Sequence, residues 1–421
     1  MTPLISKGIT VSLIILAMRA SVLACKFGLA IFVGRYLDLS SLGLYGLAVG
    51  AIALAPVVVG MGMVHVIMRE AVTLPVNKLT AHLRHYWSFT TAVYALALAA
   101  AAIHTVIFKT SDLWILIIII MIFEHFGNDV FQLLSNLERP IAANINMFIR
   151  CTAWILIYIP VALWHDSFRT LPALFEFWLA GSASAMAVFF LTNLSWPWKA
   201  AFALPFELSW IIRTIRNSFL IYISDLSFVA SLYIDRYLVT FFLGLELAGV
   251  YFLYWSVAIA ASNLVSMTVL QLQRPLLIKA HHTGADKHRH LSGSFFRTTA
   301  WVTVVLSIAT GGAFHVLLPL LNQPSIADHL PAFWLIMAAL GLRTIADAGA
   351  MALFTAHRDR IMTITNVASV IALVIALILL LPLLGLYGAG VATLMTFLGI
   401  ALWRFQLIFG LPSDLKKTVT D

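Results

Sequence analysis

The stretch Leu37-Asp38-Leu39-Ser40-Ser41-Leu42-Gly43-Leu44-Tyr45 decides how this chain of 421 residues is organised. It ends a long apolar segment, and a similar stretch follows much later as Leu243-Gly244-Leu245-Glu246-Leu247-Ala248-Gly249-Val250-Tyr251. At one constant spacing Leu37 falls on Leu243, Leu39 on Leu245, Gly43 on Gly249 and Tyr45 on Tyr251. The same spacing places Arg19 on Asp225. The repeat predicts a protein made of two related halves.

The composition is that of a membrane protein. Hydrophobic residues make up 62% of the chain and charged residues 10%, whereas a soluble domain keeps roughly a quarter of its residues charged. At roughly 20 apolar residues per spanning helix, about a dozen spans fill the chain and leave no room for a separate soluble domain. The fold class we predict is therefore an all-α integral membrane protein.

Apolar runs broken by short polar or Gly/Pro segments predict twelve transmembrane helices, because strands without a closed barrel cannot satisfy their backbone in lipid. Their predicted ranges are 8–36, 41–68, 84–108, 113–137, 141–164, 173–195, 214–242, 246–275, 295–320, 330–355, 361–383 and 387–409. They divide into an N-terminal six-helix half (1–195), a cytoplasmic or interfacial linker (196–212) and a C-terminal six-helix half (213–421).

The orientation follows from the placement of Lys and Arg. If the N-terminus is cytoplasmic, the great majority of these residues lie on the inner side, and only Arg35, Lys109 and Arg169 lie outside. This predicts a multi-pass protein of the inner (cytoplasmic) membrane with both termini cytoplasmic. Both halves then begin at the inner face, which implies a pseudo-twofold axis along the membrane normal.

Short loop motifs in a set order carry a family resemblance. They are Gly34-Arg35-Tyr36-Leu37, Leu42-Gly43-Leu44-Tyr45-Gly46, Met68-Arg69-Glu70 and the late turn Leu381-Pro382-Leu383-Leu384-Gly385-Leu386-Tyr387-Gly388-Ala389-Gly390-Val391-Ala392. With these motifs the chain resembles polysaccharide transporters of the MOP exporter superfamily, the O-antigen (Wzx-type) oligosaccharide flippases. The turn around Trp164–Thr170 departs from the pattern, since it lacks the Gly-x-x-Gly-Ala of the late turn.

The resemblance implies a MATE-like fold and a function. It implies a flippase that moves polyprenyl-(pyro)phosphate-linked oligosaccharide units across the cytoplasmic membrane by alternating access, for surface polysaccharide, O-antigen or lipopolysaccharide biosynthesis. Spans one, two, seven and eight would line the central cleft. The expected partners are the lipid-linked oligosaccharide, membrane lipids and the glycan polymerase and chain-length machinery, with no nucleic acid.

Charges within the apolar spans are the candidate site, because such residues are costly in lipid and are retained where they face protein or water. Arg19, Lys26 and Arg236 are predicted to make a cationic lumen that attracts the phosphate headgroup. Asp225 is predicted as a gate partner of Arg19 or a protonatable coupling site. The alternative is a fixed Arg19–Asp225 bridge that staples the halves.

The fourth span adds Glu124 and Asp129, which are candidates for gating or ion coupling. The alternative, which we favour, is that these carboxylates balance Arg150 and Arg343 inside the bundle. Aromatic residues of spans seven and eight are the candidate glycan contacts: Tyr222, Tyr233, Tyr251, Tyr254 and Trp255.

The sequence shows no nucleotide-binding loop, metal-ligand cluster or nucleophile–base arrangement. We therefore expect no cofactor, no metal and no catalytic residue, and a secondary transporter driven by an ion, potential or substrate gradient. A histidine-rich inner loop could bind a metal, but a basic loop against anionic headgroups explains it better. Two rivals stay open: a MATE-like multidrug or cation antiporter on the same scaffold, and a membrane-embedded glycan polymerase or ligase.

Overall fold

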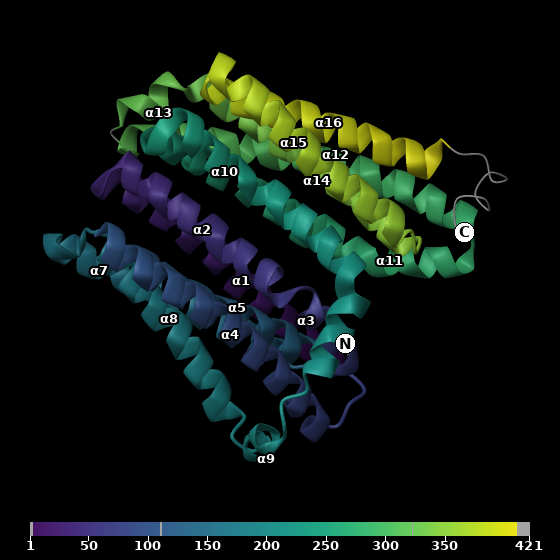
Figure 1. Cartoon of the computed structure of the whole chain (residues 1–421). Helices are drawn as coiled ribbons and strands as arrows, with labels where there is room; N and C mark the ends of the chain where they lie inside the picture. Colours follow the sequence, from purple (N-terminus) through teal and green to yellow (C-terminus); the bar gives the residue numbers. More distant parts are fainter. Residues whose placement is uncertain (1–2, 110–111, 322, 411–421) are drawn as a thin grey trace. The chain divides into compact units, whose positions relative to one another are not determined.

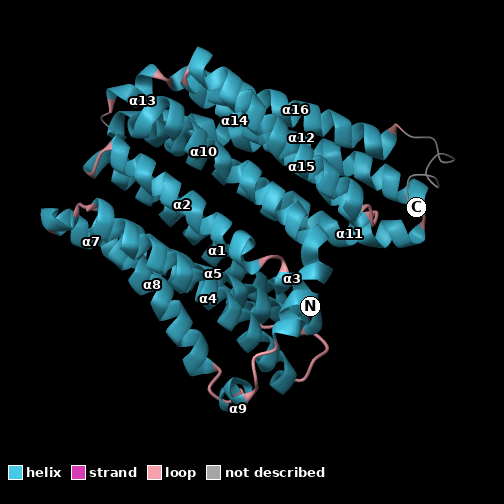
Figure 2. Cartoon of the chain, in the orientation of Figure 1, coloured by secondary structure: helices cyan, strands magenta, loops and turns pink. Residues whose placement is uncertain are grey.

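The computed structural model describes residues 3–109, 112–321 and 323–410. Every regular element in these ranges is a helix, and no strand occurs among them (Figure 2). Helices satisfy their own backbone hydrogen bonds, which apolar surroundings demand. Residues 411–421, which the predicted C-terminal half and its cytoplasmic end include, lie outside the described residues.

The elements follow one another along the chain, and Figure 1 labels most of the α-helices. They are α1 (Pro3–Tyr36), α2 (Leu39–Gly60), α3 (Met63–Glu70), α4 (Val76–Phe108), α5 (Leu113–Asn136), α6 (Pro140–Phe148), the π-helical turn η1 (Ile149–Ala153), α7 (Trp154–Trp164), the 3₁₀ turn η2 (Asp166–Phe168), α8 (Leu171–Thr192), α9 (Trp198–Ala203), α10 (Leu208–Val265), the π-helical turn η3 (Ser266–Leu270), α11 (Gln271–Thr283), α12 (Ala285–Leu321), α13 (Pro324–Asp328), α14 (Leu330–Thr355), α15 (Asp359–Leu384) and α16 (Leu386–Phe409).

The number of membrane crossings agrees with the predicted fold class. Eleven described segments are long and apolar enough to cross a membrane, and one of them, Leu208–Thr283, has 76 residues. Gly244 lies inside that segment with φ 84° and ψ 174°, so the helix breaks there into two. Glycine adopts this backbone conformation readily, whereas other residues do not. The break at Gly244 lies between the predicted spans 214–242 and 246–275. The described part of the chain is thus all-α, and its segments are consistent with twelve spanning helices.

The predicted second span, 41–68, differs from the structure. The chain leaves the helix at Met61 and Gly62, which have φ of 47° and 74°, and α3 then begins in a new direction. The interruption carries no polar residue, so the apolar run continues through it and hides the break.

By contacts the chain forms two compact units, Met1–Phe32 with Ala48–Leu226, and Val33–Leu47 with Ser227–Asp421. We call them the first and the second unit. In the first, apolar side chains of α3, α4, α5 and α8 share one core, with Met63, Leu83, Leu133 and Phe189 each at most 1% exposed. In the second, η3, α11, α12 and α14 share another around Val265 and Phe295.

The two repeated stretches meet inside the second unit. The start of α2 crosses the part of α10 that follows Gly244, and the crossing point is Gly43 against Gly249. A Cβ on Gly43 would collide with the carbonyl oxygen of Leu245, and a Cβ on Gly249 with that of Leu39. Small residues let two helix backbones approach this closely in membrane proteins. This contact explains why residues 33–47 pack with the second unit.

Candidate functional site

Buried charges are the natural place to look for a site in a membrane protein, since each costs from about 2.5 to more than 10 kcal/mol in the bilayer centre. The charged residues that are buried in the described part of the chain lie in both units. They are Glu124, Asp129 and Arg150 in the first and Asp235, Arg236, Arg343 and Arg404 in the second.

Arg236 of α10 lies in a box of aromatic rings and is 2% exposed. Its guanidinium carbon is 3.9 Å from the ring centre of Trp255, 4.7 Å from that of Tyr233 and 5.1 Å from that of Phe252. Rings at such distances stabilise a desolvated cation. Its Nη1 donates to the carbonyl oxygen of Gly46 at 3.2 Å. Its Nε and Nη2 have no hydrogen-bond partner among the described residues.

The neighbouring Asp235 does not pair with this guanidinium. Asp235 Oδ1 accepts the backbone N–H of Arg236 at 2.8 Å, and Oδ2 accepts the hydroxyl of Tyr251. The carboxylate thus turns toward Tyr251 and away from the arginine side chain. The aromatic box therefore holds a cation, two of whose nitrogens have no hydrogen-bond partner among the described residues.

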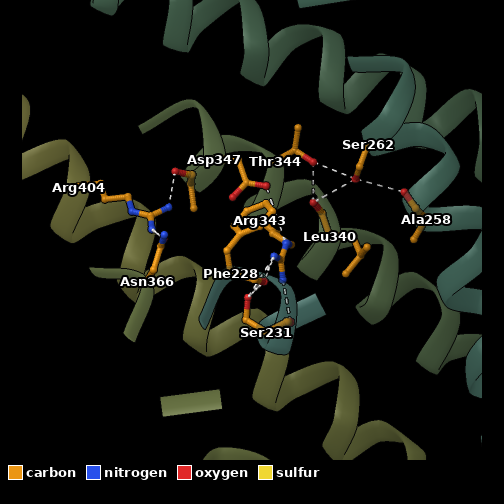
Figure 3. A network of polar contacts seen from close by, with 11 residues as sticks. Phe228, Ser231, Ala258, Ser262, Leu340, Arg343, Thr344, Asp347, Asn366 and Arg404 are labelled. Carbon is orange, nitrogen blue, oxygen red and sulfur yellow. Dashed lines mark hydrogen bonds and ion pairs between the residues drawn. The ribbon is translucent and has the colours of Figure 1, made fainter. Parts of the chain in front are cut away.

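A second arginine network runs through α14 (Figure 3). Arg343 donates through Nη1 to the carbonyl oxygen of Ser231 at 2.8 Å and through Nη2 to its hydroxyl at 3.1 Å. The Nε of Arg343 lies 3.8 Å from Oδ2 of Asp347, one helical turn away. Thr344 continues the network on the same helix by donating to the hydroxyl of Ser262 at 2.9 Å.

Arg404 of α16 lies at the edge of the same view (Figure 3). Each of its three nitrogens has an acceptor: Thr365 Oγ1 at 3.1 Å, the carbonyl oxygen of Ala346 at 2.8 Å and Asn366 Oδ1 at 2.6 Å. Because these acceptors come from α14 and α15, Arg404 ties α14, α15 and α16 together, and its role is structural.

In the first unit Glu124 of α5 is fully engaged. Its Oε2 lies 2.8 Å from Nη1 of Arg150, and its Oε1 accepts from Trp178 Nε1 at 2.8 Å and the Ser182 hydroxyl at 2.7 Å. Arg150 lies in the π-helical turn η1, and such turns occur frequently at functional sites. This is the balancing interaction with Arg150 that the sequence favoured for Glu124.

One turn along α5, Asp129 and His125 form a separate buried group. Asp129 is 1% exposed, and its Oδ2 accepts from Trp87 Nε1 at 3.2 Å and lies 3.6 Å from His125 Nε2. The imidazole is completely buried between two hydroxyls, Tyr86 at 2.8 Å from Nε2 and Tyr94 at 3.0 Å from Nδ1.

Asp225 has a different partner from the one that the repeat suggested. Its Oδ2 contacts Nε2 of His65, a residue of α3 that the sequence analysis did not consider. Arg19 instead donates from Nε to Oδ1 of Asn144 at 3.2 Å. No ion pair joins Arg19 and Asp225 among the described residues, and α3 brings His65 to the carboxylate instead. Lys26, two turns after Arg19, is exposed on α1.

The five aromatic candidates separate in space. Tyr233, Tyr251 and Trp255 surround the Asp235–Arg236 group, as described above. The hydroxyl of Tyr254 donates to the carbonyl oxygen of Ile326, and Tyr222 belongs to the first unit. Of the five, two lie against the guanidinium of Arg236, Tyr233 and Trp255, and a third, Tyr251, binds the neighbouring Asp235.

Several polar residues of these networks escaped the sequence analysis. His65, Asn144 and Asn366 each bind a charged side chain far away in the sequence. All three share one sequence feature, because each is a polar residue inside an apolar run. This feature indicates that the residue has a polar partner but does not indicate which residue that partner is.

Comparison with known proteins gives the fold. No family model and no curated protein sequence matches the chain. Among solved structures, an inward-facing multidrug resistance MATE family transporter of the MOP superfamily matches with a TM-score of 0.66 and 15% identity, over 93% of this chain and 95% of the other. The MATE multidrug transporter DinF-BH matches with a TM-score of 0.62 and 13% identity, over 94% and 96%.

An outward-facing MATE transporter of the MOP superfamily also matches, with a TM-score of 0.56 and 15% identity over 96% of this chain and 95% of the other. At such low identity these likenesses establish a MATE-like fold and nothing finer. Together with the apolar helices they support a multi-pass membrane protein.

Proposed function

We propose that this chain is a secondary transporter that flips a polyprenyl-(pyro)phosphate-linked oligosaccharide from the inner to the outer leaflet of the cytoplasmic membrane by alternating access. The glycan would serve the assembly of a surface polysaccharide such as O-antigen. The MATE-like fold supports a transporter rather than an enzyme, and the loop motifs support the flippase class.

The observation that carries the choice of substrate is the open guanidinium of Arg236. Two of its nitrogens lack partners among the described residues although the side chain is buried, and an unmet buried donor costs about 1–3 kcal/mol. Arg404 differs, because each of its three nitrogens has an acceptor. A phosphate oxygen or a sugar hydroxyl would complete the coordination of Arg236, and charge-assisted hydrogen bonds of this kind are strong.

The balance of charge in the second unit supports the same substrate. Among the described residues of the second unit, three guanidinium groups are buried, those of Arg236, Arg343 and Arg404, but only one carboxylate, that of Asp235, while Asp347 is half-buried beside Arg343. A positive surplus in a dry interior favours an anionic ligand over a cationic drug. Mostly apolar and aromatic walls with a few polar groups, as around Arg236, are typical of ligand sites.

Multidrug export is the main rival, because the structural neighbours are described as multidrug transporters. A thermal-stability screen of the purified protein separates the two. We expect polyprenyl-phosphate-linked glycans to raise the melting temperature, by preferential binding to the folded state, and cationic dyes to leave it unchanged. Stabilisation by dyes with no response to the glycan lipids would favour the rival. Polymer formed from the glycan lipid by the protein alone would revive the enzyme alternative.

A further inference from the structure

The first unit buries unequal numbers of acidic and basic side chains in its spans. Glu124 and Asp129 are both buried, and the only buried arginine of this unit among the described residues is Arg150. Arg150 already forms an ion pair with Glu124, with its Nη1 2.8 Å from Oε2 of that residue. No lysine or arginine of the described residues lies within ion-pair distance of Asp129, which has the imidazole of His125 in that range instead. One buried carboxyl group therefore lacks a permanent cation.

The surroundings of His125 suit a group that takes up and releases a proton. Each ring nitrogen contacts a hydroxyl, that of Tyr86 at 2.8 Å and that of Tyr94 at 3.0 Å. A hydroxyl can donate or accept, so the ring keeps both partners when its protonation changes. Asp129 keeps the indole N–H of Trp87 at 3.2 Å whether or not it carries a proton.

We propose that His125 and Asp129 together hold one exchangeable proton and form a proton-binding site in the first unit. The proton-binding site does not depend on the proposed function. Only the further step, in which this proton drives transport, rests on it. With the proton bound, the buried charges of the unit cancel. Without it, one negative charge has no counter-ion in an apolar region, which is unfavourable unless water reaches it. Release of the proton to water therefore favours a conformation that hydrates the pair.

The ionisable groups that act on the pair come from two other elements: Tyr86 and Tyr94 on α4 and Arg150 on η1. Glu124 is paired with Arg150 and accepts hydrogen bonds from Trp178 and Ser182. The two acids of α5 thus differ, because Glu124 has an arginine partner whereas Asp129 has no arginine or lysine within ion-pair distance among the described residues.

Infrared difference spectroscopy of the full-length protein in liposomes, without any cargo, tests the site directly. The wild type should lose a carboxylic-acid carbonyl band as the pH is raised. Asp129→Asn should lack this band, whereas Asp286→Asn, the same change at an exposed position, should keep it. If Asp129→Asn does not fold, His125→Gln serves instead, and it should shift the pH at which the band disappears.

Absence of a titrating band in the wild type would overturn the proposal, as would its persistence in Asp129→Asn or an unchanged midpoint in His125→Gln. Because this experiment contains no glycan, its outcome does not depend on whether the protein is a flippase. The driving role is tested separately in flipping assays. A pH gradient should accelerate flipping by the wild type about tenfold or more and leave Asp129→Asn at its gradient-free rate. An unaffected wild type would refute the coupling step.

Discussion

Gly43 and Gly249 hold equivalent positions in the two repeated stretches, and each lies against the helix backbone that carries the other. The contact is reciprocal: a Cβ on Gly43 would strike the carbonyl oxygen of Leu245, and a Cβ on Gly249 that of Leu39. Leu39 and Leu245 are themselves a repeated pair. The duplication that is visible in the sequence is therefore also a local two-fold contact between helices.

Replacing either glycine with alanine should destabilise the protein. Backbone cannot move aside as a side chain does, so overpacking of about 1–3 kcal/mol is expected, which exceeds the roughly 1 kcal/mol that alanine gains over glycine in a helix. Gly43→Ala and Gly249→Ala should each lower the melting temperature of the purified protein. Gly399→Ala is the control, because nothing lies within 4 Å of its added Cβ.

The double variant adds a sharper test. Both changes act on one crossing, so their effects on the free energy of unfolding should be less than additive. Melting temperatures of Gly43→Ala and Gly249→Ala equal to that of Gly399→Ala would contradict the close approach of the two stretches.

Removing one partner of the Glu124–Arg150 pair should be costly. Glu124→Gln leaves the guanidinium of Arg150 buried without its counter-ion, for which about 3–5 kcal/mol is expected. Removing both charges in Glu124→Gln/Arg150→Met should restore part of that loss, because no uncompensated charge then remains. Denaturation of the purified variants measures both effects, and a double variant less stable than Glu124→Gln would argue against the pairing.

Asp225 and His65 should act as one unit. Because the two side chains contact each other, Asp225→Asn and His65→Gln should reduce flipping to a similar extent, and the double variant should be no worse than either. The exchange Arg19→Asp/Asp225→Arg should restore nothing, since Arg19 binds Asn144. Restored flipping by the exchanged variant would show that Arg19 and Asp225 do meet during transport.

Much of the fold follows from the sequence. Apolar runs predict the spans, and the boundary expected after residue 242 coincides with the backbone break at Gly244. The break at Gly62 was missed because no polar residue marks it. Hydropathy detects where a chain leaves the apolar phase, but not where a helix changes direction within it.

The site was less predictable, for a physical reason. Local pairs follow from helical periodicity, as Arg343 and Asp347 show at one turn's spacing. Partners that come from distant helices depend on which faces meet. Periodicity does not disclose this, so the asparagine that binds Arg19 and the histidine that binds Asp225 were not anticipated. The open N–H groups of Arg236 depend in the same way on the rings that enclose it.

Arg236 is the residue that we propose receives the anionic part of a lipid-linked glycan. The most direct measurement is the flipping rate of a labelled polyprenyl-phosphate oligosaccharide in proteoliposomes that contain Arg236→Gln, compared with Arg297→Gln, which removes the same charge from an exposed position on α12. Hydrogen bonds to a charged group contribute about 1.5–3 kcal/mol, so Arg236→Gln should be slower by about tenfold or more while Arg297→Gln matches the wild type. Wild-type flipping by a folded Arg236→Gln protein would contradict the account.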